Sequence, residues 1–245
     1  MEALGHAVLA AAAALGLDAE LMARYGPAVL KGLGTTLALV ALTVPLGFAL
    51  AWPIALARID AGPLVRGAAR GFTGFFRGTP LLAQLFLLYY GAGEFSAALR
   101  SAGLWVLFRD PFWCSVIAFT LNTAAYQAEI LAGALRAVPA GQTEAARALG
   151  FGPMSAYARV IAPQALLIAL RPLGNEVILM IKASSVASVV TVVDLMGATK
   201  RAFSGSVDFE VYVWAALIYL ALVEIVRRTW NGLERRMTRH LRSAG

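Results

Sequence analysis

Apolar residues in this chain form long runs without charge, and charged residues mark the ends of those runs. Residues 32–57 contain no charged residue and are bounded by Lys31 and Arg58. A helix needs about 20 apolar residues to cross the hydrocarbon core of a bilayer, so this run predicts a first membrane span. The uncharged run 78–93 is short for a span, and it predicts a second one if the helix begins near Gly71. Further runs predict a third span over 111–128 and a last one over 211–226. Pro111 after Asp110 suits the start of the third.

The segment 163–196 is apolar but less regular than the other runs. It is interrupted by charged residues and by two weak helix formers, namely Arg171, Glu176, Lys182, Asp194, Pro172 and Gly174. Irregular or charged segments at membrane depth lie inside protein or beside a water-filled cavity. The pattern therefore predicts one broken span over 166–184 and a short, partly inserted helix after it. The expected fold is an all-α integral membrane protein with five transmembrane helices.

Basic residues divide unevenly between the two sides that this arrangement defines. The connections at 58–77 and 136–171 and the end at 227–242 hold fourteen of them, against six in the segments on the other side of the predicted spans. Cytoplasmic loops carry an excess of Lys and Arg, so the richer set is expected to face the cytoplasm. The N-terminus then lies outside and the C-terminus inside.

Composition supports a membrane protein and argues against several other classes. Hydrophobic residues make up 60% of the 245 residues and charged residues 14%, whereas a soluble domain carries about 25% charge. The net charge of +7 comes from basic residues at the ends of apolar runs, which indicates lipid anchoring rather than nucleic acid binding. Cys114 is the only cysteine, and the two histidines lie near opposite ends, so neither a disulfide within the chain nor a metal site is expected.

The N-terminal residues hold a short apolar run, 7–17, preceded by Glu2 and by no Lys or Arg. A signal peptide requires a basic start, and a span requires a longer run, so a segment lying on the outer membrane surface is expected. We expect an outer, periplasmic segment over 1–28, one membrane domain over 29–230 and a basic cytoplasmic tail over 231–245.

A polar, alanine-rich stretch separates the third and fourth spans, with the sequence Glu144-Ala145-Ala146-Arg147-Ala148-Leu149-Gly150. Pro139 and Gly141 are expected to end the preceding helix. Thr143 is expected to cap a new helix, and the helix dipole stabilises the negative charge of Glu144 at its start. Gly150 suits the left-handed residue after a helix, and Pro153 can begin the next helix. This slim helix is either an ordinary surface helix or a rod that enters a groove on a partner protein.

Several motifs are similar to those of one transporter family. Glu144–Gly150 followed by Val160-Ile161-Ala162-Pro163 resembles the EAA signature, by which membrane subunits of ATP-binding-cassette (ABC) importers hold their ATPase. Further motifs resemble polar amino acid ABC permeases, and with the signature they cover roughly residues 72–185: Phe76-Arg77-Gly78-Thr79-Pro80-Leu81 with Gln84, Leu121-Asn122-Thr123-Ala124-Ala125-Tyr126 with Glu129-Ile130, Val138-Pro139-Ala140-Gly141-Gln142, and Asn175-Glu176-Val177-Ile178-Leu179-Met180. The resemblance implies a type I ABC importer permease fold, similar to that of the methionine permease, with a coupling loop over 139–163.

Within that family the chain is most similar to the M-type subunit of the histidine and lysine/arginine/ornithine importer and to opine-uptake permeases. The Ala132-Gly133-Ala134 string, the Asn175–Met180 string and the terminal arginines favour this branch. Ala162 stands in place of a usual leucine, and Lys182-Ala183-Ser184-Ser185 follows the family's K-D-T-S only loosely. The coupling residues implied are Glu144, Ala145, Ala146, Leu149, Gly150 and Pro163.

The resemblance also implies the substrate class and the other subunits of the transporter. It implies a bacterial inner membrane transporter, driven by ATP, for basic amino acids (histidine, arginine, lysine, ornithine) or opines. The partners implied are a second permease subunit, either a Q-type paralogue or an identical copy, two ABC ATPase subunits and a periplasmic substrate-binding protein. ATP and Mg would bind the ATPase, so no cofactor is expected on this chain. The terminal arginines either touch the ATPase or anchor the chain.

Polar residues inside spans are costly and mark candidate contacts with the transported solute. Asn122, Tyr126 and Glu129 share one helix face. Glu129 either attracts a cationic substrate or forms an ion pair with Arg77 or Arg136. Glu176 and Lys182 either pair with each other or face the path with Asn175 and Ser185, and Gln84 either lines the path or bonds another helix.

Two other classes of function remain open on the sequence alone. A secondary transporter or channel without an ATPase could use the intramembrane charges, although the chain shows none of the internal repeats usual for that design. An intramembrane enzyme is disfavoured because the catalytic motifs H-E-x-x-H and G-x-S-x-G are absent from the sequence. We therefore expect no catalytic residues.

Overall fold

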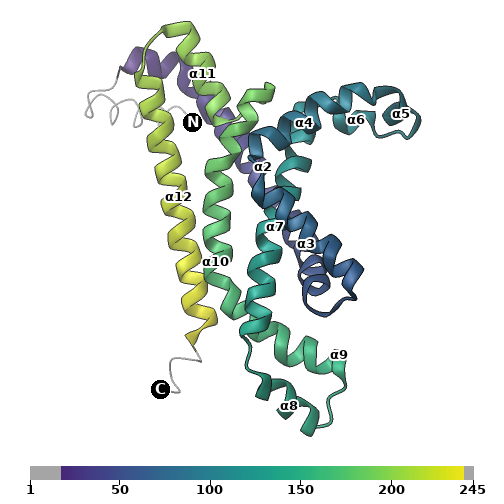
Figure 1. The fold of residues 1–245 in the computed structure, drawn as a ribbon. Coiled ribbons are helices and arrows are strands. Elements are labelled where there is room, and N and C mark those ends of the chain that lie inside the picture. Colours follow the sequence, from purple (N-terminus) through teal and green to yellow (C-terminus); the bar gives the residue numbers. More distant parts are fainter. Residues whose placement is uncertain (1–17, 240–245) are drawn as a thin grey trace.

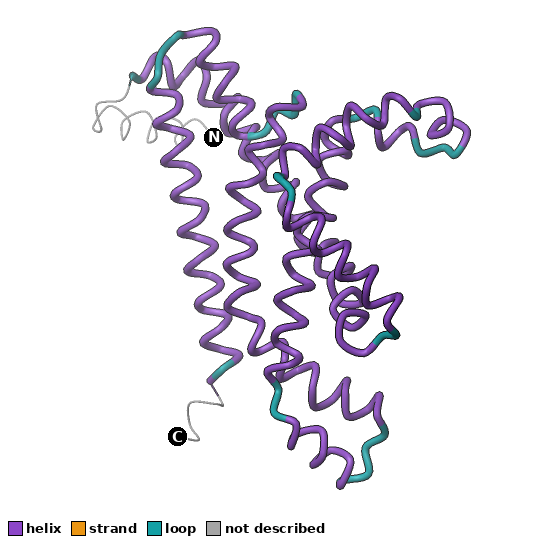
Figure 2. Tube along the Cα trace, viewed as in Figure 1, coloured by secondary structure: helices purple, strands orange, loops and turns teal. Residues whose placement is uncertain are grey.

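The computed structural model describes residues 18–239, and the regular structure of this part is entirely helical (Figures 1 and 2). The helices in chain order are α2 (Ala19–Asp60), α3 (Pro63–Gly78), α4 (Leu81–Glu94), α5 (Ser96–Ser101), α6 (Trp105–Phe108), α7 (Pro111–Ala137), α8 (Ala140–Ala148), α9 (Pro153–Ala156), η1 (Tyr157–Ile161), α10 (Ala162–Ala183), η2 (Ser184–Val190), α11 (Leu195–Ser206) and α12 (Glu210–Met237). The segment expected on the outer surface, 7–17, lies outside the described residues.

The first predicted span is part of a much longer helix. α2 has 42 residues and begins after Asp18, whose carboxylate accepts hydrogen bonds from the amides of Glu20 and Leu21. It then continues through three prolines to Asp60. The side-chain cap explains the early start, because it satisfies amides at the helix N-terminus that have no partner within the helix.

The second predicted span is divided, and its expected beginning near Gly71 within one helix is wrong. α3 ends at Gly78, Thr79 is extended with φ −114° and ψ 147°, and α4 starts at Leu81. Pro80 accounts for the break, because a proline disfavours helical backbone in the residue before it. The two helices therefore meet at a bend whose polar groups need other partners.

The fourth predicted span shows the opposite error, because α10 runs without a break through Pro172. The carbonyl of Leu170 receives a hydrogen bond of 2.8 Å from the indole of Trp230 on α12, beside the close packing of that indole on Gly174. A short helix, α11, follows α10 and η2, as expected, and is capped by Asp194. Packing against α12 thus outweighs the weak local preference for helix.

The core lies where α2, α7 and α10 meet. One cluster contains Leu39, Phe119 and Met180, and a second contains Ala55, Leu131, Ala169 and neighbouring small residues. Gly47 on α2 lies against Thr123 and Gln127 on α7, where a Cβ would overlap the threonine. Small residues let these helices approach closely.

The long helices α7, α10 and α12 run side by side, with α8 and α9 projecting at one end and α4–α6 extending near the other (Figure 1). Two helical segments in the described part are long and apolar enough to cross a membrane by length and composition: Ala19–Asp60 and the continuous Pro153–Val190. The number of five spans and the orientation of the termini stay predictions.

Candidate functional site

The polar stretch after α7 forms the short helix α8, but it starts earlier than expected. The helix begins at Ala140 after Pro139, so Thr143 and Gly141 lie inside it and Thr143 does not cap it. Glu144 is therefore in the second turn, beyond the reach of the dipole effect expected for it. Pro139 supplies the start instead, because it fixes extended backbone before the helix.

The end of α8 follows the prediction. Gly150 has φ +81°, the left-handed conformation expected of it. The amide of Phe151 donates to the Ala146 carbonyl at 3.0 Å, and that of Gly150 donates to Arg147 at 2.9 Å. These two bonds define a Schellman motif, which closes a helix end. Pro153 is the first residue of α9, also as expected.

The α8–α9 hairpin presents a mixed surface at the end of the molecule (Figure 1). Leu149 and Met154 are 79% and 78% exposed, and Glu144 and Ala145 are also exposed. Ala146, by contrast, is buried. The projecting hairpin therefore leaves two large apolar side chains uncovered in this chain.

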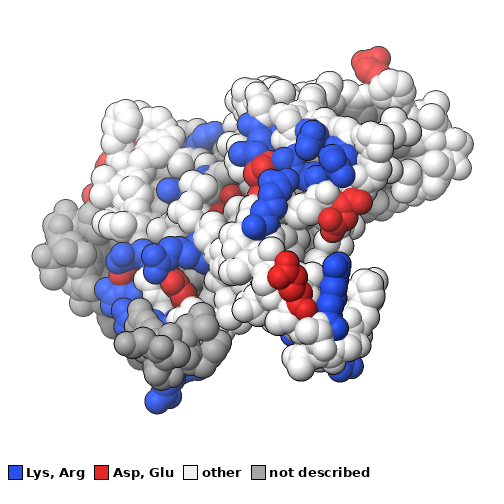
Figure 3. Space-filling view, turned by 60° about the horizontal axis from the view of Figure 1, so that its bottom comes forward, with Lys and Arg blue, Asp and Glu red and all other residues white. Residues whose placement is uncertain are grey.

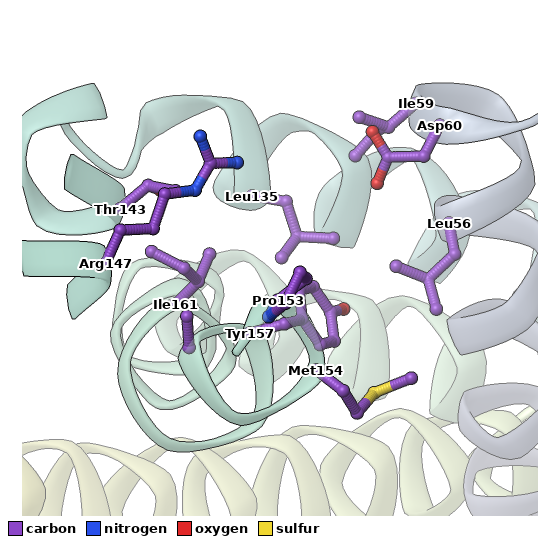
Figure 4. A pocket seen from close by; sticks show the side chains of 11 residues that line it. Leu56, Ile59, Asp60, Leu135, Thr143, Arg147, Pro153, Met154, Tyr157 and Ile161 are labelled. Atoms are coloured by element: carbon purple, nitrogen blue, oxygen red, sulfur yellow. The ribbon is translucent and has the colours of Figure 1, made fainter. Parts of the chain in front are cut away.

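A cavity of about 590 Å³ lies behind this hairpin (Figure 4). Arg147 and Thr143 from α8 line it, together with Leu56 and Asp60 from α2 and Tyr157 from η1. This cavity therefore separates the hairpin from the end of α2.

The second half of the coupling signature lies on an irregular turn. The amide of Ala162 bonds the carbonyl of Tyr157, five residues earlier, so η1 is a wide π-turn. Pro163 follows directly and is exposed. A proline cannot donate to the carbonyl four residues before it, and the wider turn accommodates its ring.

On the end that carries α8 and α9, Lys and Arg side chains gather in several groups (Figure 3). These groups lie on the end that is predicted to face the cytoplasm.

The bend between α3 and α4 is surrounded by amide side chains. Gln84 donates from Nε2 to the carbonyl oxygens of Phe76 at 2.9 Å and Thr79 at 3.0 Å. Asn122 on α7 donates to the same Phe76 carbonyl and to Oε1 of Gln84, both at 3.0 Å. Gln84 and Asn122, both buried, therefore satisfy the end of α3. The sequence left two roles open for Gln84, lining the transport path or bonding another helix, and its bond with Asn122 of α7 is the second of these.

Glu129 lies in a three-residue charge cluster, which we call the Glu129 cluster: Glu129, Arg58 and Arg77. Its carboxylate is 2.8 Å from the guanidinium of Arg58 and 2.8 Å from that of Arg77. Arg58 also bonds the hydroxyl of Thr73 on α3. The ion pair expected with Arg77 is present, whereas Arg136 is not a partner of Glu129 among the described residues. The cluster joins α2, α3 and α7.

Tyr126 lies between the bend and the Glu129 cluster. Its ring centre is 5.5 Å from the guanidinium carbon of Arg77, and its hydroxyl is 3.4 Å from the Arg77 carbonyl oxygen. Asn122, Tyr126 and Glu129 thus all contact the last turn of α3 or its side chains, on the one face that their spacing predicts.

Glu176 is buried, at 6% exposure, and accepts a hydrogen bond of 2.9 Å from the hydroxyl of Thr123 on α7. Gln127 extends this network with bonds to Thr123 and to the Val44 carbonyl. The alternative pairing of Glu176 with Lys182 is wrong for the described structure, because Lys182 is exposed on a different face of α10. Six residues turn a helix by about 240°, which separates the two side chains.

The remaining two path candidates are not joined to this network. Asn175 is exposed, and Ser185 in η2 donates to the Lys182 carbonyl near the end of α10 at 2.8 Å. Sequence reasoning also missed Arg58, Thr123 and Gln127 as network members. A signal existed for the last two, because polar residues four apart on one helix share a face. Their partners, however, are distant in sequence.

Comparisons with known proteins agree with this geometry. Residues 43–239 match a family described as the binding-protein-dependent transport system inner membrane component. The nopaline transport system permease protein NocM of Agrobacterium fabrum is 38% identical over 228 residues, which are 93% of this chain and 95% of the relative. The histidine/lysine/arginine/ornithine transport system permease protein HisM of Salmonella typhimurium is 38% identical, covering 86% of this chain and 91% of the relative.

Solved structures are similar as well. A chain from a structure described as an amino acid ABC transporter with histidines superposes with a TM-score of 0.78 at 35% identity, covering 90% of this chain and 99% of that chain. An inward-facing MetNI methionine ABC transporter gives a TM-score of 0.68 at 20% identity, over 86% of this chain and 96% of the other. The second likeness concerns the fold alone.

Proposed function

The chain belongs to the family of binding-protein-dependent transport system inner membrane components, and we propose that it serves an ATP-driven importer of basic amino acids or opines as a permease subunit. The relatives named for nopaline and for histidine, lysine, arginine and ornithine support this substrate class. These solutes share a carboxylate and a nitrogen-rich, basic end. A binding protein outside the membrane would deliver them.

The observation that carries the proposal is the projecting α8–α9 hairpin. Its glycine-closed end and the exposed Leu149 and Met154 present a preformed apolar surface. In the proposed role this surface enters a groove on the ABC ATPase, and Glu144 and Ala145 contact it from the open side of α8. ATP and Mg would bind that partner. The open cavity behind the hairpin leaves room for it to tilt when the ATPase closes.

Orientation supports the same role. With five spans, an outer N-terminus and an inner C-terminus, the hairpin faces the cytoplasm, where ATP is available. The basic groups seen on that end of the molecule in Figure 3 favour this orientation. A second permease subunit, either a Q-type paralogue or an identical copy, would complete the path, and two ATPase subunits would serve the pair.

Co-purification with the ATPase tests the coupling role. We expect Glu144→Lys and Gly150→Asp to lower the amount of ATPase retained on the assembled membrane complex, while both variants stay in the membrane. Glu94→Lys is the matched control, because Glu94 is exposed at the end of α4 and receives the same change of charge. Full retention of the ATPase and normal transport in both hairpin variants would rule out the docking role.

Uptake competition tests the substrate class. Complexes reconstituted with their binding protein and ATP are expected to import labelled arginine, with inhibition by histidine, lysine, ornithine or an opine. Inhibition by neutral amino acids alone would contradict the proposed class while leaving the coupling role intact.

A further inference from the structure

The Glu129 cluster carries an excess positive charge. One carboxylate is shared by two guanidinium groups, each at 2.8 Å. The side chain of Arg58 is 11% exposed and has a second bond to Thr73, so it is enclosed. The side chain of Arg77 is 40% exposed. Arg77 is therefore the more accessible of the two guanidinium groups that share the Glu129 carboxylate, and excess charge within a membrane protein is costly unless an anion or water accompanies it.

Arg77 is held in place with one edge free. Its Nη1 donates to Glu129, and the ring of Tyr126 lies 5.5 Å from its central carbon. Within residues 18–239, neither Nε nor Nη2 of Arg77 donates a hydrogen bond. The planar guanidinium fork matches a carboxylate with two parallel hydrogen bonds, and this arginine is already oriented. Lys182 is also exposed, but no comparable contacts orient it in the described part of the chain.

Several polar side chains lie near Arg77, and two of them, Gln84 and Asn122, are buried. Gln84, Asn122, Tyr126 and Glu129 form a row along the junction of α3, α4 and α7. The distance along α7 from Asn122 to Glu129 is about 10 Å at 1.5 Å per residue. Lipid-facing helix surfaces are apolar, whereas rows of polar and ionisable residues mark the path of a solute.

We propose that the free edge of Arg77 binds the carboxylate of the transported solute. This inference rests on the proposed function, since every amino acid or opine of that class carries a carboxylate. Glu129 and Tyr126 act as positioning residues that hold the guanidinium, and Arg58 neutralises Glu129 so that Arg77 keeps its charge for the solute. Selection for the carboxylate then resides in this chain as well as in the binding protein.

Direct binding to the purified complete transporter in nanodiscs, without its binding protein, tests this assignment. The probes are L-arginine and L-argininamide, which lacks the carboxylate charge but keeps the basic groups. We expect the wild-type complex to bind arginine about tenfold or more tightly than the amide, a ratio in the range for losing one charge-assisted contact. Arg77→Gln should weaken arginine binding by a similar factor and leave amide binding unchanged, and Arg77→Lys should lie between.

Arg70→Gln is the matched control, because Arg70 is an exposed arginine on the same helix and lies outside the Glu129 cluster. It should bind both probes as the wild type does. Equal weakening of both probes by Arg77→Gln would show a structural role and overturn the assignment. Unchanged binding in that variant, or wild-type binding that does not distinguish the probes, would overturn it as well.

Lipid composition and ATP-dependent uptake provide two further arms of the experiment. If Arg77→Gln alters binding only in nanodiscs that contain anionic lipid, the arginine holds a lipid headgroup and the assignment is wrong. ATP-dependent uptake of labelled arginine by the wild type tests the proposed function separately. A transporter that imports arginine but ignores the carboxylate contradicts only the role of Arg77, whereas one that imports no basic amino acid or opine contradicts the proposed function.

Discussion

Replacing Gly150 with alanine isolates the backbone geometry of the α8–α9 hairpin from its contacts. Gly150 has φ +81°, and a Cβ built there would meet nothing within 4 Å. The variant therefore suffers no clash, and its cost comes from the left-handed conformation, about 1–2 kcal/mol for an L-residue. The loss of freedom in the unfolded chain offsets about 0.4–1 kcal/mol of this. A net cost near 1 kcal/mol lowers the population of this turn relative to other backbone conformations by about fivefold, and docking of the ATPase should weaken by up to that factor.

The assay measures the fraction of ATPase that stays bound to the membrane complex through a dilution series, together with solute imported per ATP hydrolysed. Gly150→Asn should lose less than Gly150→Ala, because asparagine tolerates the left-handed region better. Gly152→Ala is the control, since Gly152 has φ −66° and open space around it. Equal retention in the alanine variants at 150 and 152 would refute the argument that the shape of this turn sets the docking surface.

Two further outcomes are expected in thermal unfolding of the purified complex. Gly174→Ala should lower the free energy of unfolding by about 1–3 kcal/mol, and Tm with it, because the new methyl group would overlap the indole of Trp230. An unchanged Tm would show that α10 packs less closely on α12 than this overlap requires. Asn122→Leu should cost about 1–3 kcal/mol by leaving polar groups at the bend without a partner, and its loss should exceed that of Asn175→Leu at an exposed position.

Features set by a few adjacent residues were predictable. Asp110 followed by Pro111 marks the start of α7, Gly150 ends α8 and Pro153 begins α9. In each of these, the backbone preference of one or two residues decides the outcome, so the local sequence is sufficient.

Proline inside an apolar run was the least reliable signal, because its effect depends on what packs around it. Pro80 ends one helix and separates it from the next, although the surrounding apolar run suggested a single span. Pro172 suggested a break, yet α10 continues, with Trp230 bonded to the Leu170 carbonyl nearby. The partner of that carbonyl lies 60 residues away along the chain, and hydropathy over a short window cannot reveal it.

The sequence indicated several residues of the polar network, but it did not indicate most of their hydrogen-bond and ion-pair partners. The helical spacing of Asn122, Tyr126 and Glu129 correctly predicts a shared face. Their partners include Arg58, which is 71 residues from Glu129, and Phe76, which is 46 residues from Asn122. Such contacts depend on how α2, α3 and α7 pack together, and one sequence holds no direct record of that packing.

Transport by the complete complex in proteoliposomes tests the central claim most directly. The measurement is the accumulation of labelled arginine with the binding protein outside, with or without ATP on the side of the ATPase, and with ionophores that abolish ion gradients. An ATP-driven permease subunit predicts accumulation that requires both ATP and the binding protein and that ionophores leave unchanged. Accumulation that persists without ATP and collapses with an ion gradient would contradict the account and identify a secondary transporter.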